Sequence, residues 1–357
     1  MSITCRQATE KDFDKIISFL DKCYQKDFKA LLPKVYLHKE YASSHLLLEE
    51  DNKIIAVIGN FVNQQYGFSF VGSVAIDPEY QNRGLLRKLF EEVDKFNKEN
   101  KVNFTFLTGD KYLYEKYGYY RVGALYGFRF IEKSMNYLMP TQYDDIYFMS
   151  ANKDDEEKLY EIYKASTKAV YRSKDRFIET CLSYDGKLME IRKSGAIIGY
   201  FIINQMGMIG EIALSDPIYL TSVIHLLNHD QGQSIVMMNH DNPLFSEAKK
   251  YADSFMNLSF LSAKIYDLDA FMKYVFILDS NYKKEDNSLL LGIDDKNFCF
   301  KIKNNEINVS VTDQEADIKL SMKKFMSLFT PEGLECTHKA LRSLFPIYFD
   351  IPTSDHY

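Results

Sequence analysis

A glycine-bearing heptapeptide, Gln81-Asn82-Arg83-Gly84-Leu85-Leu86-Arg87, has the composition of a phosphate-binding loop. It follows a β-rich run that ends at Asp77-Pro78 and precedes an apolar stripe with helical spacing. The first amides of a helix lack intrahelical partners and lie at the positive end of its dipole, so they bind phosphate oxygens. Gly84 would let the main chain approach a diphosphate, and Arg83 and Arg87 would add charge-assisted hydrogen bonds. An ordinary strand-to-helix turn is the alternative, since short glycine motifs recur by chance.

The elements around this loop follow from local patterns. Thr9 and Asp12 have the spacing of a capping box, and the apolar stripe behind them predicts a helix. The further predictions, in order, are an antiparallel hairpin over 45–49 and 54–62, strands at 68–76 and 104–108, a helix over 86–96 between them, and a short helix at 112–116. Gly109 and Asp110 end the last of these strands.

The second third of the chain repeats this order. A helix through 159–163 precedes predicted strands at 188–192, 196–204 and 211–214. The last of them ends in Ser215-Asp216-Pro217, as the earlier one ends in Asp77-Pro78. We therefore expect a duplicated domain. Because Ile218-Tyr219-Leu220-Thr221 stand where the first copy has Gln, Arg and Gly, the second copy is expected to have lost its ligand.

From about Asp267 the pattern changes to a small α+β domain. Its predicted strands lie at 288–293, 298–302, 307–311 and 317–320, and its predicted helices at 323–329 and 335–344. The chain then continues to Asp355, His356 and Tyr357.

Composition excludes several classes of protein. A chain of 357 residues with 46% hydrophobic residues should fold into two or three domains. A net charge of -6 argues against a nucleic-acid partner and would suit a cationic small molecule, although a merely solvated acidic surface is the simpler explanation. No apolar run reaches the about 18 residues of a membrane span, so we expect a cytoplasmic protein.

We expect no metal centre. The five cysteines are scattered without a CxxC pair, and they are typical of reduced, partly buried side chains. His225 and His229 have the i, i+4 spacing of two ligands, but no third ligand is evident.

Two segments resemble the GCN5-related N-acetyltransferase (GNAT) superfamily. Gln81, Arg83 and Gly84 match its signature of Gln or Arg, two residues, Gly, one residue, then Gly or Ala, from which Leu86 departs. The segment 114–119, Tyr-Glu-Lys-Tyr-Gly-Tyr, resembles the aromatic-glycine segment after the superfamily's fifth strand. The whole domain order is similar to that of the enhanced-intracellular-survival acetyltransferases, in which a Leu-Leu loop is usual.

The resemblance implies tandem GNAT folds, each a mixed, mostly antiparallel sheet flanked by helices, followed by a sterol-carrier-like α+β domain. The expected bounds are 1–145, 146–266 and 267–357. Acetyl-CoA would be the cofactor, with its diphosphate on residues 81–87. The strand residues Val74, Ala75 and Ile76 would bind the pantetheine arm through their main chain, and Gly109 and Asp110 would line the other side.

The resemblance also implies catalytic roles. Tyr114 would be the general acid for the departing thiolate, and the terminal carboxylate of Tyr357 would be the general base. A phenol has a reference pKa near 10, so proton transfer from it to a thiolate is slightly unfavourable. A terminal carboxyl group has a reference pKa of about 3.5, so its carboxylate acts as a base only when it is desolvated or acts through a water. Three alternatives stay open: Tyr114 as a purely structural residue, a frayed chain end, and His356 or water as the base.

The expected reaction is acetyl transfer to a primary amine, as in an aminoglycoside-like polyamine. A noncatalytic acyl-CoA-binding or interaction scaffold is the alternative, suggested by the altered second copy. The resemblance further implies a homo-oligomer, such as a hexamer.

Overall fold

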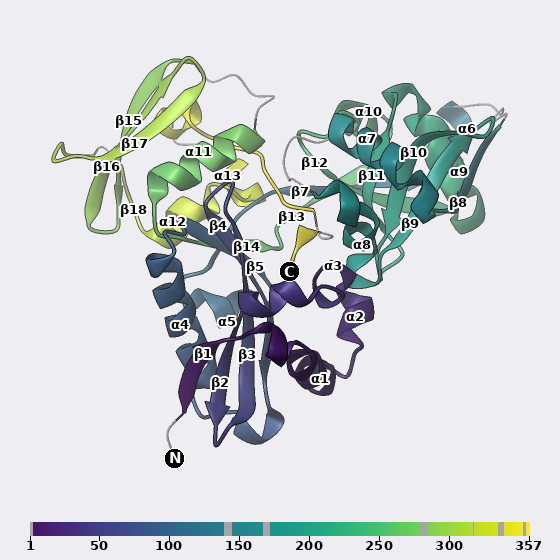
Figure 1. Cartoon of the computed structure of the whole chain (residues 1–357). Coiled ribbons are helices and arrows are strands. Elements are labelled where there is room, and N and C mark those ends of the chain that lie inside the picture. The colour runs from purple at the N-terminus through teal and green to yellow at the C-terminus, as the bar shows by residue number, and fades with distance from the viewer. Residues whose placement is uncertain are drawn as a thin grey trace.

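The computed structural model describes residues 3–138, 145–166, 172–279, 285–316, 318–334, 339–352 and 355–357. Three sheets with their helices form three lobes, and the carboxyl terminus lies at the centre, where the lobes meet (Figure 1).

The first sheet has the order β1-β2-β3-β4-β5-β14-β6. Its strands are β1 Thr4–Gln7, β2 His45–Glu50, β3 Lys53–Asn63, β4 Phe68–Ile76, β5 Phe104–Thr108, β14 Leu261–Ile265 and β6 Tyr120–Arg121. Only β4 and β5 pair in parallel; the other neighbours are antiparallel. The sheet is therefore mixed and mostly antiparallel, as predicted.

Helices cover both faces of this sheet because its strands alternate apolar side chains between the two faces. The helices are α1 Phe13–Tyr24, α2 Phe28–Leu31, α3 Pro33–Tyr36, α4 Leu85–Glu99 and α5 Lys111–Glu115. Leu47 and Val57 face α1 to α3, whereas Leu46 and Leu48 face α4. The predicted capping box of Thr9 and Asp12 is present before α1.

The second sheet has the order β13-β7-β12-β11-β10-β9-β8. Its strands are β13 Ser254–Leu258, β7 Leu125–Ile131, β12 Gln233–Asn239, β11 Ile209–Leu214, β10 Ala196–Ile203, β9 Lys187–Lys193 and β8 Ile146–Ser150. Its helices are α6 Glu132–Leu138, α7 Glu156–Ser166, α8 Phe177–Leu182, α9 Leu220–Gln231 and α10 Phe245–Tyr251. A parallel pair, β11 and β12, again lies among antiparallel strands, so the predicted duplication of the fold is confirmed.

Two strands cross between the copies. β7 follows β6 in the chain but pairs with β12 and β13 in the second sheet. β14 follows β13 but inserts between β5 and β6 in the first sheet. The first two sheets therefore do not divide at residue 145, because each of them contains a strand from the other side of that predicted boundary, whereas every strand of the third sheet lies after residue 266.

The third sheet has the order β17-β16-β15-β18. Its strands are β15 Asn287–Ile293, β16 Lys296–Lys303, β17 Glu306–Val311 and β18 Ile318–Leu320, and its helices are α11 Leu268–Leu278, α12 Met322–Ser327 and α13 Pro331–Leu334. The four strands and the first helix of this predicted α+β unit are present. The second predicted helix begins outside the described residues, and Lys339–Ser343 within it form a 3-10 helix. The predicted likeness to a sterol carrier stays a prediction.

One continuous apolar core joins the third unit to the first sheet. Aromatic side chains of β4 and β5, including Phe68 and Phe104, pack against Phe271 and Tyr274 of α11. The carboxyl-terminal segment shares this core through Phe349, which is buried. This packing places the last residues of the chain close to β4.

Candidate active site

The predicted phosphate loop lies between the end of β4 and the start of α4. Gly84 is the residue before α4 and has φ +73°, and Asn82 has φ +62°. No side chain caps the first amides of this 15-residue helix, and its first turn has no acidic residue. Residues 81–84 are exposed. Unpaired amides at an open helix terminus are the arrangement that binds phosphate oxygens.

The two arginines of the loop lie at its rim. Arg83 stacks its guanidinium on the Tyr80 ring, 4.6 Å from the centroid, and approaches Glu50 at 3.9 Å. Arg87 pairs with Glu91 at 2.8 Å, and both side chains are exposed. Such exposed pairs are weak, so an incoming diphosphate could compete for either cation.

Strands β4 and β5 separate beyond a short paired stretch. Their parallel pairing runs from Phe68–Phe104 to Val71–Leu107 and goes no further. The next residues of β4 form a bulge, in which Ser73 has φ +49°. A bulge bends a strand away from its neighbour, and here it opens a pocket of about 190 Å³ between the two strands.

The predicted pantetheine strand borders this opening. Val74 lines the pocket, and its carbonyl oxygen accepts a hydrogen bond of 2.6 Å from the Tyr24 hydroxyl. Ala75 and Ile76 lie further along β4, toward the loop at 81–87, and pair with β3. The pocket and the loop are therefore joined by one strand.

The two predicted catalytic residues, Tyr114 and Tyr357, line this same pocket. The terminal carboxyl group of Tyr357 lies directly on Gly72 of β4: a Cβ added there would fall 1.6 Å from the carboxyl oxygen. Only glycine admits the chain end at this position. The Tyr357 ring stacks on Phe61 at 4.6 Å and has the Lys34 ammonium 4.1 Å from its centroid.

Tyr114 is held against the other wall of the pocket. Asp110 caps α5 by accepting hydrogen bonds from the amides of Tyr112 and Leu113, at 2.8 and 3.1 Å. A Cβ on Gly109 would lie 2.7 Å from the Tyr114 ring, so glycine permits this contact. Burial, together with the negative charge of Asp110, raises the pKa of Tyr114 above its usual value. Its phenol thus carries a proton at neutral pH, as a general acid requires.

His356 has a different setting from Tyr357. Its Nε2 lies 2.9 Å from the Ile351 carbonyl oxygen, which can only accept, so this nitrogen carries the proton. The ring stacks on Phe70, and burial lowers the pKa of His356 to about 4. The imidazole lines a larger cavity of about 490 Å³ next to the first pocket.

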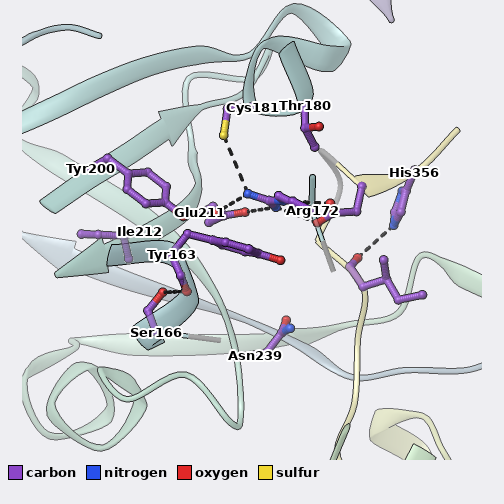
Figure 2. A network of polar contacts seen from close by, with 12 residues as sticks. Tyr163, Ser166, Arg172, Thr180, Cys181, Tyr200, Glu211, Ile212, Asn239 and His356 are labelled. Atoms are coloured by element: carbon purple, nitrogen blue, oxygen red, sulfur yellow. Dashed lines mark hydrogen bonds and ion pairs between the residues drawn. The ribbon is translucent and has the colours of Figure 1, made fainter. Parts of the chain in front are cut away.

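An ion network anchors the tail, and no local sequence pattern predicts it. The Arg172 guanidinium donates to Asp355 at 2.6 and 2.8 Å and to Glu211 at 2.6 and 2.9 Å. Tyr200 donates to Glu211 at 2.6 Å, and Arg172 also approaches Cys181 (Figure 2). Arg172 and Asp355 are buried, so this end of the chain is anchored and not frayed.

Other predicted features are placed as follows. His225 bonds to Asn136 through its Nε2. Within the described residues, no group of three or more His, Cys, Asp or Glu side chains could hold a metal ion. No helix in that part of the chain is both long and apolar enough to cross a membrane. Cys336 lies outside the described residues, and the other four cysteines are free thiols.

Comparisons with known proteins agree with this geometry. Residues 4–122 match the family model of the acetyltransferase (GNAT) domain. No curated protein matches the chain. Among solved structures, a GCN5-related N-acetyltransferase from Anabaena variabilis has a TM-score of 0.67 at 13% identity and covers 96% of this chain and 92% of its own.

Two further structures are similar over nearly the whole chain. A probable N-acyltransferase from Enterococcus faecalis has a TM-score of 0.65 at 15% identity, covering 92% of this chain and 90% of its own. Eis1 from Mycobacterium abscessus has a TM-score of 0.61 at 14% identity, with the same two coverages of 92% and 90%. These likenesses establish the shared fold, and the family match adds the domain type: the chain carries a GNAT acetyltransferase domain in residues 4–122.

Proposed function

We propose that the chain is an N-acetyltransferase that transfers the acetyl group of acetyl-CoA to a primary amine. The diphosphate would bind the open amides of Gly84, Leu85 and Leu86, with Arg83 and Arg87 at the rim. The pantetheine arm would follow β4 past Ile76, Ala75 and Val74 into the opening between β4 and β5. The single observation that supports this most is that Tyr114 and Tyr357 line this opening together, with the terminal carboxyl group of Tyr357 on Gly72.

The chemistry follows from these positions. The amine nitrogen attacks the thioester carbonyl carbon, and the carbon-sulfur bond breaks as the amide forms. The amine loses a proton to the Tyr357 carboxylate, directly or through a water, and Tyr114 gives its phenolic proton to the departing sulfur. The ring of Tyr357 packs against the rings of Phe61 and Phe70, which holds the residue that carries the carboxylate in place.

Other features of the function also remain proposals. Gly109 and Asp110 would border the acetyl group opposite β4. The acceptor implied by the resemblance is an aminoglycoside-like polyamine, and a homo-oligomer such as a hexamer is the implied assembly. His356 is the less favoured base, because its Nε2 proton is held by a carbonyl and its pKa is low. The rival function is a scaffold that binds acyl-CoA without turnover.

A thiol-release assay with purified chain, acetyl-CoA and a panel of primary amines tests the proposal. We expect Tyr114→Phe to lower turnover by about 10²-fold or more while CoA affinity, measured by calorimetry, stays unchanged. Tyr112→Phe is the matched control, because Tyr112 lies on the same helix and is 76% exposed. Residues added after Tyr357 should have a similar effect on turnover, and the same residues added before Met1 should not.

Two results would contradict the proposal. Release of no thiol with any amine, together with intact CoA binding, would favour the scaffold. Equal losses of turnover and CoA affinity in Tyr114→Phe would remove the acid role from this residue.

A further inference from the structure

The second copy retains an opening between its parallel strands. β11 and β12 correspond in order to β4 and β5, and their parallel register is limited to Ile209 and Val236. Past that pair, Glu211 and Ile212 of β11 and residues 237–239 of β12 line the cavity of about 490 Å³. The strand separation that forms the first pocket thus occurs in both copies.

The opening of the second copy lacks a diphosphate site. The 3-10 helix Pro217–Tyr219 leads directly into α9, and Tyr219, the residue before α9, has right-handed helical φ and ψ. No glycine stands there, and no loop separates the two helices. A CoA-like ligand would therefore find strand edges but no exposed amides for its diphosphate.

The cavity instead adjoins the first pocket. Thr108 of β5 and Tyr184 line both. Pro352 and His356 of the tail form part of the larger cavity, while Tyr357 lines the smaller one. A ligand in the larger cavity could therefore extend a short group past Thr108 and Tyr184 toward the terminal carboxyl group.

The lining of the larger cavity is apolar and adaptable. Four methionines contribute to it: Met206, Met208, Met237 and Met238. Methionine side chains are flexible and polarizable, so they mould to apolar groups of varied shape. Met206 is 72% exposed, which leaves an apolar side chain open to solvent beside the cavity.

The lining carries few charges, one cation and two carboxylates. The charged side chains that line the cavity are Arg121, Glu211 and Asp241. Glu211 is already bound to the buried Arg172, and Arg121 adds a further positive charge. A ligand with several ammonium groups would have to desolvate charges that this lining does not match, which is costly.

We infer that this cavity, the counterpart of the cofactor opening in the second copy, binds the acceptor as a single amine attached to an apolar body, such as an arylalkylamine or alkylamine. The inference rests on the proposed function and narrows it, since it selects against the polycationic acceptors that the resemblance implies. The apolar body would lie among the methionines, and the amine would lie toward Tyr357.

Thiol release and direct binding test this inference together. We expect kcat/KM for 2-phenylethylamine and hexylamine to exceed that for spermine and kanamycin by about 10-fold or more. Met208→Glu should lower kcat/KM for 2-phenylethylamine about 10-fold and narrow or reverse this preference. Met149→Glu is the matched control, because Met149 lies on β8 of the same copy, outside the cavity lining, and is 38% exposed. Unchanged Tm values would show that both variants fold.

The outcomes separate the two claims. Turnover that prefers spermine or kanamycin overturns the inference and leaves the proposed function standing. If no amine releases thiol, the proposed function fails. Ligand-observed NMR then still tests whether the cavity binds 2-phenylethylamine. Weaker binding of 2-phenylethylamine by Met208→Glu, with unchanged binding by Met149→Glu, would support the site. Equal binding by the parent and both variants would overturn it.

Discussion

The two copies end β4 and β11 alike and begin the following helix differently. Asp77 accepts a hydrogen bond from the Glu79 amide, and Asp216 accepts one from the Ile218 amide, so each closes a 3-10 turn. In the first copy residues 81–84 then lead to α4, whereas in the second copy α9 follows the 3-10 turn at once. Separated parallel strands thus occur with and without an exposed helix terminus, and the loop at 81–84 distinguishes the copy for which we propose phosphate binding.

The second copy has a feature that the first lacks. Its Arg172, which also donates to Glu211, holds Asp355, two residues before the end of the chain. The chain end then lies on Gly72, in the first copy. The comparison suggests a division of labour in which one copy binds the cofactor and the other positions the tail and the acceptor.

The largest expected effect comes from breaking that tail anchor. Arg172→Met leaves Glu211 and Asp355 facing each other without their cation, and removing one partner of a buried ion network typically costs about 3–5 kcal/mol. We expect lower stability in urea unfolding and a large loss of turnover, because the carboxyl terminus loses its position on Gly72. Thiol release with CoA binding as a second readout checks this.

Lys174→Met is the control for Arg172. Lys174 lies two residues away and pairs with Glu157, and both side chains are exposed. Exposed pairs contribute little, so this variant should keep stability and turnover. If Arg172→Met turned over normally, the second copy would not be needed to place the tail.

A smaller, pH-dependent effect is expected at Asp350, where the tail passes between the copies. Burial, with the charge of Asp241, raises the pKa of Asp350 to about 8. A carboxyl group with a folded pKa above its unfolded value favours folding when protonated, so its contribution is lost as pH rises from about 4 to about 8. Asp350→Asn should therefore be more stable than the parent at pH 9, by a few kcal/mol at most, and equal to it near pH 4.

Thermal unfolding of the parent and Asp350→Asn across this pH range measures the difference directly. Comparing the two proteins at each pH cancels other titrating groups, such as Lys34, whose pKa burial lowers to about 7. A stability difference that does not grow as pH rises would show that the pKa of Asp350 is not raised in the folded protein.

Local patterns predicted the first copy well. The loop, its flanking strand and helix, and the short helix at Tyr114 lie where glycine positions and apolar periodicity placed them. Predictions of this kind succeed because each depends on neighbouring residues only. The catalytic roles of Tyr114 and Tyr357 were suggested by resemblance, and the pocket that they share depends on tertiary packing.

Long-range features were not predictable in the same way. The exchange of β7 and β14 between the sheets depends on pairings more than 100 residues apart, such as Tyr126 with Met238 and Ser262 with Leu107. Arg172 lies 183 residues from Asp355, and a lone arginine has no local pattern that reveals a buried partner. The α11 segment, Leu268–Leu278, is absent from the predicted elements, although the length and period of its apolar run are compatible with a buried helix.

The smallest expected effect isolates the loop itself, using one glycine from each copy. Gly84 has φ +73° and Gly232, the C-cap of α9, has φ +70°, and a Cβ at either would meet no atom within 4 Å. Alanine at either site thus costs the same left-handed strain, about 1–2 kcal/mol, without a clash. We expect equal small losses in Tm, whereas the Kd for CoA should rise about 10-fold in Gly84→Ala only, because there the methyl group meets the diphosphate. Calorimetric titration with CoA decides, and equal affinities in the two variants would show that the first copy binds its cofactor by other groups.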